Sequence, residues 1–527
     1  MFVAGNNPIE KIKAEKDGLD ILQEIDKIAA EGYDKISAAD VERLKWIGAF
    51  LRKKRPGYFM IRIRITGGRA NSKQVRAIAQ ISEQLGNGVL DITTRQQVEL
   101  RAIKIESVPQ ILKDLQDVDL NAFQTGLDNI RNVNTCPISG LNPNEVLDAY
   151  PQAVEFTDVF LKNKEYTNLP HKMNVTITGC QDNCTHPESQ DIGLVPALKM
   201  GSGPIEKGFN VLVGGKMGSG GFYNAKDLDV FVQPEDAAKI CSEIALLFRD
   251  FGFRDERTKC RLSFLIQDWG IEKFRAELHS RWKAKYGGSL SRAEADQRSD
   301  DGTNHLGIHP QRQPGLYFAG LSIPVGRVTA KQMLELARLA EFYGSGEIRF
   351  TPQQNVILTY IPREKIEALK EEPLLSQLSP APGPLTLGLV SCVGIDYCNL
   401  ALIETKGIAV QVVAELEKRL GKENISSLRM HWSGCEAACA NHHTADIGLQ
   451  GIKANIDDRI VDAVHIFVGG KTGKNARSGE KIMELVPVTM LPDVLELIIR
   501  NMALLKKVRR NTEAEKRVVM VPMDYAA

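Results

Sequence analysis

Four cysteines in two close pairs are the residues of this sequence that are best placed to do chemistry together. Cys392 and Cys398 form a C-x5-C pair, and Cys435 and Cys439 form a C-x3-C pair after a gap long enough for a helix. Thiolates that converge on one point bind a metal ion or an iron–sulfur cluster. We therefore expect these four residues to bind an inorganic cofactor, and most of the functional argument depends on which one.

The spacing of the four cysteines leaves three interpretations open. Zinc sites usually have ligands two to four residues apart in both pairs, and a C-x5-C pair is long for that pattern. An iron–sulfur cluster takes one thiolate per iron and is found with varied spacing. Four buried thiols without a ligand are the third interpretation. The chain has nine cysteines, an odd number, which in a reducing compartment favours metal chemistry or buried thiols over disulfides.

Basic residues in strand-like and loop-like segments predict a second kind of site, a pocket for an anion. A surface salt bridge would explain any one of them, but several in apolar or Gly/Pro-bounded segments indicate a cavity lined by cations. Such a cavity suits a polycarboxylate cofactor, a small oxyanion, or both. The residues are Arg62 and Arg64 in FMIRIRI, Arg95 and Arg101 in TTRQQVELR, Arg131 in NIRNVNTC and Lys172 in LPHKMN.

The composition is that of an ordinary globular protein with several domains. At 527 residues the chain is too long for one compact core. Its formal net charge of +1 does not predict a nucleic-acid partner, although the basic runs at 52–55 and 506–510 could meet an acidic protein. No apolar stretch approaches the ~18 to 20 residues that span a bilayer. The N-terminus has neither a signal-peptide core nor a transit-peptide bias, so we expect a cytoplasmic protein without a membrane anchor.

One pattern occurs twice along the chain, which indicates a tandem duplication. The segment TGCQDNCTHPESQDIGL around Cys180 matches SGCEAACANHHTADIGL around Cys435, 255 residues later. Further upstream, GGRANSKQ (67–74) matches VGRVTAKQ (325–332), and TTRQQV (93–98) matches TPQQNV (351–356), both at an offset of 258. Chance does not keep one register over several motifs.

Each half has the same expected order of elements. An extended segment (YFMIRIRIT or LYFAGLSIP) leads into an amphipathic helix (SKQVRAIAQISEQLG or AKQMLELARLAEFYG) that ends at glycine. A second strand, the cysteine region and a VGGK turn follow. Strands alternating with helices predict an α/β (α+β) fold built from two pseudo-twofold halves.

The duplication predicts one shared cofactor between the halves, with a complete ligand set in only one of them. Cys136 corresponds to Cys392, but Asn142 stands near the position that matches Cys398. We therefore interpret Cys136, Cys180 and Cys184 as remnants of a former site. The remaining cysteines, Cys241 and Cys260, are expected to be buried structural thiols.

The ordered set of motifs resembles the sirohaem- and [4Fe–4S]-containing nitrite and sulfite reductase family, most closely the ferredoxin-dependent nitrite reductases. It comprises KAEKDGLD, TTRQ, LP-x-K-x-N, GIHPQRQPGLYFAGLSIPVGR, YGSGEIRFT, the C-x5-C with its ETKG tail, and the C-x3-C with ADIGL-x-G. The resemblance implies the nitrite/sulfite reductase haemoprotein-like fold, with ferredoxin-like half-domains and two larger α/β domains around a central sirohaem. The expected boundaries are an N-terminal helical segment at 1–50, a first ferredoxin-like half-domain at 51–120, a first sirohaem-binding α/β domain at 121–286, a linker at 287–304, a second ferredoxin-like half-domain at 305–370, and a [4Fe–4S]- and sirohaem-binding α/β domain at 371–527.

The same resemblance implies a role for each candidate residue. Cys392, Cys398, Cys435 and Cys439 would bind a [4Fe–4S] cluster, and Cys439 would also bridge to the sirohaem iron. The implied substrate-binding residues are Arg95, Arg131, Lys172 and Asn174, and the implied sirohaem-binding residues are Arg62, Arg64, Arg101, Gln353 and Asn355. The departures from the family pattern are His171 before the lysine, the CVGIDYC and CEAAC loops, and the neighbouring His442 and His443.

The implied function is the six-electron reduction of nitrite to ammonium by a monomer that takes electrons from reduced ferredoxin. Asn174 favours nitrite, because sulfite reductases of the family usually carry a second lysine there and less positive charge suits a monoanion. A sulfite reductase with the same cofactors is the nearest alternative. A non-catalytic cluster- or zinc-binding protein is a more distant one, and a precorrin-modifying relative of the same fold is more distant still.

Overall fold

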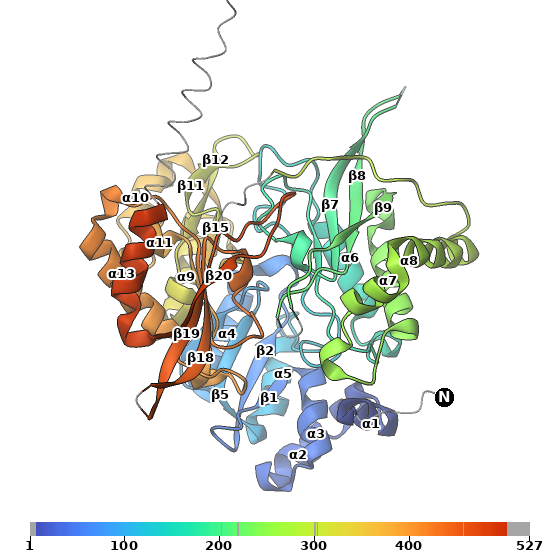
Figure 1. Cartoon of the computed structure of the whole chain (residues 1–527), viewed down its shortest axis with the longest axis horizontal. Helices are drawn as coiled ribbons and strands as arrows, with labels where there is room; N and C mark the ends of the chain where they lie inside the picture. Colours follow the sequence, from blue (N-terminus) through green and yellow to red (C-terminus); the bar gives the residue numbers. More distant parts are fainter. Residues whose placement is uncertain are drawn as a thin grey trace, which may run out of the picture.

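The computed structural model describes residues 7–502, apart from 202, 219–220, 300–301, 303 and 457. Within these residues the chain forms four five-stranded sheets, and helices cover them (Figure 1). No helix in this part of the chain is long and apolar enough to cross a membrane. The basic run at 506–510 lies outside the described residues.

The leading segment is helical, and it joins the first sheet at its end. Asn7 caps the first helix, because its side-chain oxygen accepts from the backbone N–H of Ile9 at 3.1 Å. The last residues before position 51 are already part of strand β1, which pairs with β2. The elements are α1 (Pro8–Glu15), α2 (Ile25–Glu31), α3 (Ala38–Arg43) and β1 (Ala49–Leu51).

Two small sheets exchange strands between the two halves of the chain. Their strand orders are β1-β2-β5-β4-β13 and β11-β12-β15-β14-β3, so each sheet takes its last strand from the other half. The first half contributes β2 (Tyr58–Ile63), β3 (Arg69–Asn71), α4 (Ser72–Leu85), β4 (Val89–Ile92), β5 (Val98–Lys104) and α5 (Val108–Gln116). The second half contributes β11 (Gly307–Pro310), β12 (Leu316–Leu321), β13 (Arg327–Thr329), α9 (Ala330–Tyr343), β14 (Glu347–Phe350), β15 (Val356–Pro362) and α10 (Ile366–Lys370).

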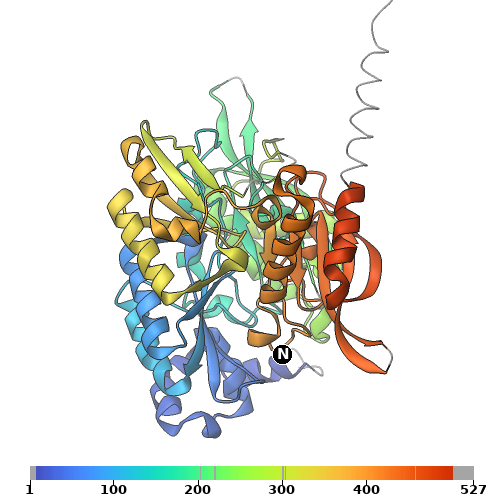
Figure 2. The same cartoon turned by 90° about the vertical axis from the view of Figure 1, so that its left-hand side faces the viewer.

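Helices α4 and α9 are equivalent elements that begin with the same local chemistry. Each starts at a capping box, formed by Asn71 with Gln74 in α4 and by Thr329 with Gln332 in α9. The two helices pack against each other along one side of the molecule (Figure 2). Their apolar faces and both small sheets share one continuous core, so the two half-domains form one packing unit.

The two larger domains lie on opposite sides of the molecule in Figure 1, and each has its own sheet and core. In both sheets a short strand pairs in parallel with a long strand that continues into an antiparallel meander. The first comprises α6 (Tyr150–Phe160), β6 (Val175–Ile177), β7 (Ile192–Lys199), β8 (Glu206–Val213), β9 (Lys226–Val232), α7 (Ala237–Phe251), α8 (Leu262–Tyr286) and β10 (Ala295–Asp296). The second comprises α11 (Pro384–Leu387), β16 (Leu389–Ser391), α12 (Gly394–Tyr397), α13 (Lys406–Leu420), β17 (Met430–Ser433), β18 (Ile447–Ile456), β19 (Arg459–Val468), β20 (Glu480–Pro487) and a helix at 491–502.

The stretch at 287–304, expected as a linker, contains β10, which pairs with the edge of β7.

In the two small sheets, corresponding residues of the two halves make equivalent side-chain hydrogen bonds. Gln96 Nε2 donates to the carbonyl of Phe350 and Gln354 Nε2 donates to the carbonyl of Ile92, both at 3.0 Å. The predicted pseudo-twofold α/β fold is therefore confirmed at the level of side-chain contacts as well as topology.

Candidate active site

The TTRQ motif forms the turn between β4 and β5 and positions Arg95. Thr93 Oγ1 accepts from the backbone N–H groups of Arg95 at 3.2 Å and Gln97 at 3.1 Å, which closes the turn. Gln96 takes a positive φ of 58° and anchors the turn through its side chain, which is fully buried. The Arg95 side chain therefore starts from a fixed backbone.

Arg95 belongs to a polar network that reaches the first large sheet. Its Nη1 donates to Gln190 Oε1 at 3.2 Å. The amide orientation of Asn174 that satisfies its neighbours lets its oxygen accept from Arg95 Nη2 at 3.0 Å and from Arg261 Nη2 at 3.3 Å. Arg261 in turn pairs with the buried Asp191, at 2.6 Å. The network holds Arg95 and Asn174 in one geometry.

Arg131 and Lys172 come from two adjacent loops that are bonded to each other. The Arg131 backbone N–H donates to the carbonyl of Met173 at 2.8 Å, and its guanidinium donates to the carbonyls of Thr125 and Leu127. Behind these loops, Asp128 pairs with Arg257 and accepts from Lys13 Nζ at 3.2 Å. These contacts hold the two loops in place.

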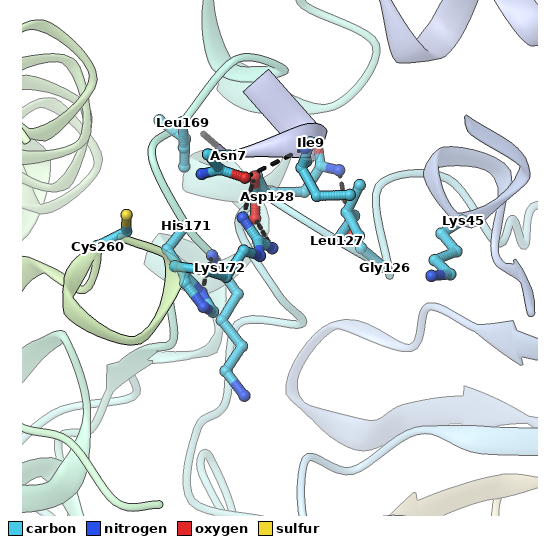
Figure 3. Close-up of polar contacts among 12 residues, drawn as sticks. Asn7, Ile9, Lys45, Gly126, Leu127, Asp128, Leu169, His171, Lys172 and Cys260 are labelled. Atoms are coloured by element: carbon cyan, nitrogen blue, oxygen red, sulfur yellow. Dashed lines mark hydrogen bonds and ion pairs between the residues drawn. The ribbon is translucent and has the colours of Figure 1, made fainter. Parts of the chain in front are cut away.

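Figure 3 gives the direction of the Lys172 side chain. The contacts of Asp128 lie together on one side, and the Lys172 ammonium extends away from them with no dashed contact to the residues drawn. His171 accepts the backbone N–H of Lys172 through Nδ1 at 2.8 Å, so the unusual histidine orients the lysine backbone. Burial and the nearby Arg257 and Arg261 lower the pKa of His171, so it stays neutral.

Burial and mutual repulsion lower the pKa values of these cations. Burial, followed by the charges of Arg261 and Arg131, lowers the pKa of Lys172 to about 7, and Cys439 opposes this shift. Burial and Arg261 lower the pKa of Arg95 to about 10, and Cys439 again opposes the shift. The pKa of Arg131 is lowered by burial and by Arg62 and Arg95. The first half therefore brings a group of cations to a thiol of the second half.

The four cysteines lie in the loops that follow two neighbouring parallel strands. Cys392 comes directly after β16, and Cys435 comes just after β17, so the parallel pairing brings the two loops to one edge of the sheet. The backbone N–H of Gly434 donates to Cys392 Sγ at 3.1 Å, and that of Leu400 donates to Cys398 Sγ at 3.3 Å. Such N–H donors stabilise thiolates that bind iron.

The separation of the sulfurs suits a cluster better than a single zinc ion. Ligands of one zinc ion lie within about 4.6 Å of each other, because each Zn–S bond is about 2.3 Å long. Among the described residues, no three of the four cysteines have their sulfurs within 4.8 Å of one another. Nevertheless Cys392, Cys398 and Cys439 are close enough to Cys435 to help raise its pKa, after burial, to about 12. Thiols that are neighbours but not in contact suit a larger inorganic group.

The remaining predicted residues are mostly committed to contacts within the chain. Arg64 is buried and donates to the carbonyls of Phe123, Gln124, Ile130 and Arg131. Arg101 is buried between Asp91 and Glu99, and Arg62 Nε donates to Glu99 at 2.8 Å. Asn355 accepts the backbone N–H of Ile323 at 2.9 Å. These contacts shape the site, and the direct cofactor contacts expected of these residues stay predictions.

Gln353 occupies the position that corresponds to Arg95 in the repeat. Its hydrogen bond to a cysteine loop is equivalent to one that Thr94 makes in the other half. Its Nε2 donates to the carbonyl of Cys184 at 2.9 Å, whereas Thr94 Oγ1 donates to the carbonyl of Cys439 at 3.0 Å. Within the described residues, Gln353 Oε1 is buried and has no hydrogen-bond partner. The two turns thus approach the two cysteine loops in the same way.

Some residues of the site were not expected from the sequence. Asp191 could be found from the repeat, because it recurs as Asp446. Gln190 lies in the repeated segment but corresponds to Ala445, and Arg261 belongs to no repeated pattern. Lys216 of the first VGGK turn is 1% exposed, and its Nζ has no hydrogen-bond partner in the described part of the chain. Burial and Arg261 lower the pKa of Lys216 to about 8. A buried cation of this kind suits a carboxylate-bearing cofactor.

In this duplicated α/β scaffold, cations of one half lie near a group of four cysteines in the other half. This combination is typical of redox enzymes that reduce bound anions. The sequence model of the nitrite and sulphite reductase 4Fe–4S domain matches residues 126–286 and 383–516, and that of the nitrite/sulfite reductase ferredoxin-like half domain matches 51–118 and 309–375. These matches cover more than half of the chain. The chain belongs to the nitrite and sulphite reductase family.

Relatives from distant organisms cover nearly all of the chain. A ferredoxin–nitrite reductase of Synechococcus elongatus is 43% identical over 94% of this chain and 96% of its own length. The chloroplastic ferredoxin–nitrite reductase of Zea mays is 38% identical over 97% of this chain and 92% of its own. The solved structure of the Mycobacterium tuberculosis NirA protein superposes with a TM-score of 0.89 at 29% identity, covering 95% of this chain and 94% of that one.

Proposed function

We propose that the protein reduces nitrite to ammonium in a six-electron reaction, with reduced ferredoxin as electron donor. The observation that carries this proposal is the position of Cys439 of the second half, whose carbonyl accepts from Oγ1 of Thr94, the neighbour of Arg95 in the first half, at 3.0 Å. The named relatives above are ferredoxin–nitrite reductases, which supports nitrite over the sulfite alternative.

Two cofactors complete the proposed site. Cys392, Cys398, Cys435 and Cys439 would hold a [4Fe–4S] cluster, and Cys439 would also bind the sirohaem iron. Bound together, these groups would supply the one-electron transfers that reduction of the anion requires. The sulfur spacing, the N–H donors to Cys392 and Cys398, and the buried ammonium of Lys216 fit these groups.

The chain's own residues bind the anion and supply protons. Arg95 and Arg131 are held by the contacts described above, so they present fixed positive charge without reorganisation during the reaction. Lys172 has a pKa of about 7 and therefore carries a proton that it can donate near neutral pH. Asn174 accepts from Arg95 and Arg261, and it keeps Arg95 aimed without adding another charge.

The experiment that tests this function combines a spectrum with two rates. The purified protein is expected to have sirohaem absorption bands with an iron–sulfur shoulder, and to reduce nitrite with a higher kcat/KM than sulfite when driven by reduced viologen. A protein with zinc and no visible absorption would contradict the redox assignment. Faster turnover of sulfite would contradict the substrate.

The first basic run lies directly on the loop of Cys392 and Cys398, which makes it the proposed docking site for ferredoxin. Arg52 Nη2 donates to the carbonyl of Asp396 at 2.7 Å, and Lys54 Nζ donates to the carbonyl of Ala401 at 3.2 Å. Lys53 and Arg55 stay exposed, and Arg55 lines a surface hollow of about 560 Å³. An acidic donor bound here would reach the cluster loop by a short path.

Charge reversal at this surface tests the docking site. The double variant Lys53→Glu, Arg55→Glu is expected to lower the ferredoxin-driven rate about 10-fold at low salt and to leave the viologen-driven rate unchanged. The matched control is Lys207→Glu, Lys226→Glu on the first large sheet, where both lysines are exposed. Equal ferredoxin kinetics in both double variants, with equal salt dependence, would place the docking site elsewhere.

We also propose that the protein is a monomer in the cytoplasm. Sedimentation tests the oligomeric state, and cell fractionation tests the location.

A further inference from the structure

A second group of metal-binding side chains lies in the first half of the chain, away from the four-cysteine site. The ligand atoms of Cys136, Cys184 and His305 all lie within 4.8 Å of one another. All three side chains are buried, with relative exposures of 1%, 0% and 7%. The nitrite reductase reaction proposed above makes no use of them.

A third cysteine adjoins this group. Cys180 is 1% exposed, and its thiol donates to Asp182 Oδ2 at 3.1 Å. Asn142, at the position that matches Cys398, donates from Nδ2 to Cys180 Sγ at 3.3 Å. The group is therefore the pseudo-twofold equivalent of the four-cysteine site, with asparagine in place of one cysteine and with His305 added from a different segment.

The distances suit one ion and leave no room for a cluster. Cys136 Sγ lies 3.8 Å from His305 Nε2. A tetrahedral ion with a Zn–S bond of about 2.3 Å and a Zn–N bond of about 2.0 Å separates such a sulfur and nitrogen by about 3.5 Å. Cysteine and histidine are the ligands that zinc prefers in proteins.

The backbone holds His305 in place at a conformational cost. His305 has a φ of 55°, in the left-handed region that few residues other than glycine adopt. Its carbonyl oxygen passes so close to Gly320 that a Cβ on that glycine would lie 1.9 Å from it. The histidine therefore occupies a defined position where the stretch at 287–304 enters the second half.

We propose that Cys136, Cys184 and His305 bind one zinc ion, with the buried Cys180 beside them. The ion would join the cysteine loops of the first large domain to the start of β11, and would thus hold the two halves together where the chain crosses between them. Zinc binds cysteine as the thiolate, so binding releases protons and is weaker at low pH. The role is structural, because the three protein ligands are buried and the reaction proposed above makes no use of them.

Zinc analysis of the purified holoenzyme, made in zinc-supplemented medium, tests this proposal. We expect about one zinc per chain, and zinc K-edge X-ray absorption with Zn–S distances near 2.3 Å and one Zn–N contribution. The His305→Gln and Cys184→Ser variants should each lose at least about ten-fold in zinc content. The matched control is Cys241→Ser, a buried cysteine outside the group, which should keep the zinc.

The proposal would be overturned if the wild-type protein held no zinc even after incubation with Zn²⁺ under reducing conditions, or if its zinc had the oxygen-only shell typical of surface binding. Iron in place of zinc, or a disulfide among Cys136, Cys180 and Cys184, would also overturn it. Full zinc retention in His305→Gln would do the same. The sirohaem spectrum of each variant reports whether the chain has folded. The wild-type absorption edge decides the question if a variant fails to fold.

Discussion

The two cysteine sites of the molecule derive from one ancestral unit and now differ in size and exposure. In the second half, Cys392, Cys398 and Cys435 are half-buried and Cys439 is exposed, and their sulfurs are spread apart. In the first half Cys136, Cys180 and Cys184 are buried, and the sulfurs of Cys136 and Cys184 lie within 4.8 Å of each other and of a ring nitrogen of His305. The same strand–loop framework thus positions a partly exposed set of four thiols in one half and a buried set of three in the other.

The comparison indicates that the two halves contribute different parts of the proposed site: thiols from the second half and cations from the first. The second half kept the fourth cysteine and left Cys439 accessible, whereas the first half kept the basic turn that faces it. Arg95 in the first half corresponds to the neutral Gln353 in the second. In the proposed function, this asymmetry would attract an anion to the side of the pseudo-twofold axis that carries Arg95 and Cys439.

The largest effect is expected when the first turn is made to resemble the second. Arg95→Gln removes a fixed positive charge beside Cys439 and should lower kcat for nitrite by about 10² to 10³, as loss of one preorganised anion-binding group does. Arg95→Lys keeps the charge and should lose less. Steady-state kinetics with reduced viologen measure both variants. Equal losses in the two variants would mean that the geometry of the guanidinium, and not its charge, is what matters.

Lys172 sharpens the comparison, because its lowered pKa links activity to pH and to stability. Lys172→Met should lower kcat by about 10² and remove the fall in rate that we expect of the wild type as pH rises through about 7. The folded state disfavours the charged lysine, so wild-type stability should rise with pH from about 7 toward 10.5, and the variant should melt at a higher temperature at pH 7. Thermal unfolding of both proteins at several pH values measures this. A lower melting temperature for the variant would contradict the assigned cause.

The smallest of these effects concerns the choice of anion. Asn174→Lys adds a charge next to Arg95 and Arg261 and removes the oxygen that both arginines use. The ratio of kcat/KM for sulfite to that for nitrite should rise by about 10-fold, because added positive charge stabilises a dianion more than a monoanion. Asn174→Gln, which keeps the amide, is the control. An unchanged ratio would remove Asn174 from the account of specificity.

The sequence predicted the duplicated fold and the grouping of the four cysteines because both depend on repeated patterns. The capping boxes of α4 and α9 and the strands beside them could be located from the repeat and from local periodicity. The strand exchange through β3 and β13 could not, since it depends on long-range pairing that leaves no local signal. Arg64 and Arg101 illustrate the same limit, because sequence cannot tell whether a buried arginine meets a ligand or a carbonyl of its own chain.

His305 was missed for a related reason. It lies outside the repeat, and only the folded chain brings it to Cys136 and Cys184. The three cysteines of the first half therefore resembled remnants when their spacing alone was considered. The position of Asn142 at the site could be predicted from the offset, because the repeat keeps its register there.

The most direct test of the central claim is the yield of ammonium from nitrite, with reduced ferredoxin as donor, for the wild type and for Cys439→Ser. Cys241→Ser, a buried cysteine far from either site in sequence, is the control for the loss of a thiol. We predict one ammonium per nitrite consumed for the wild type and the control, and none for Cys439→Ser. Ammonium formation by Cys439→Ser at the wild-type rate would contradict the claim that this thiol joins the electron supply of the second half to the anion pocket of the first.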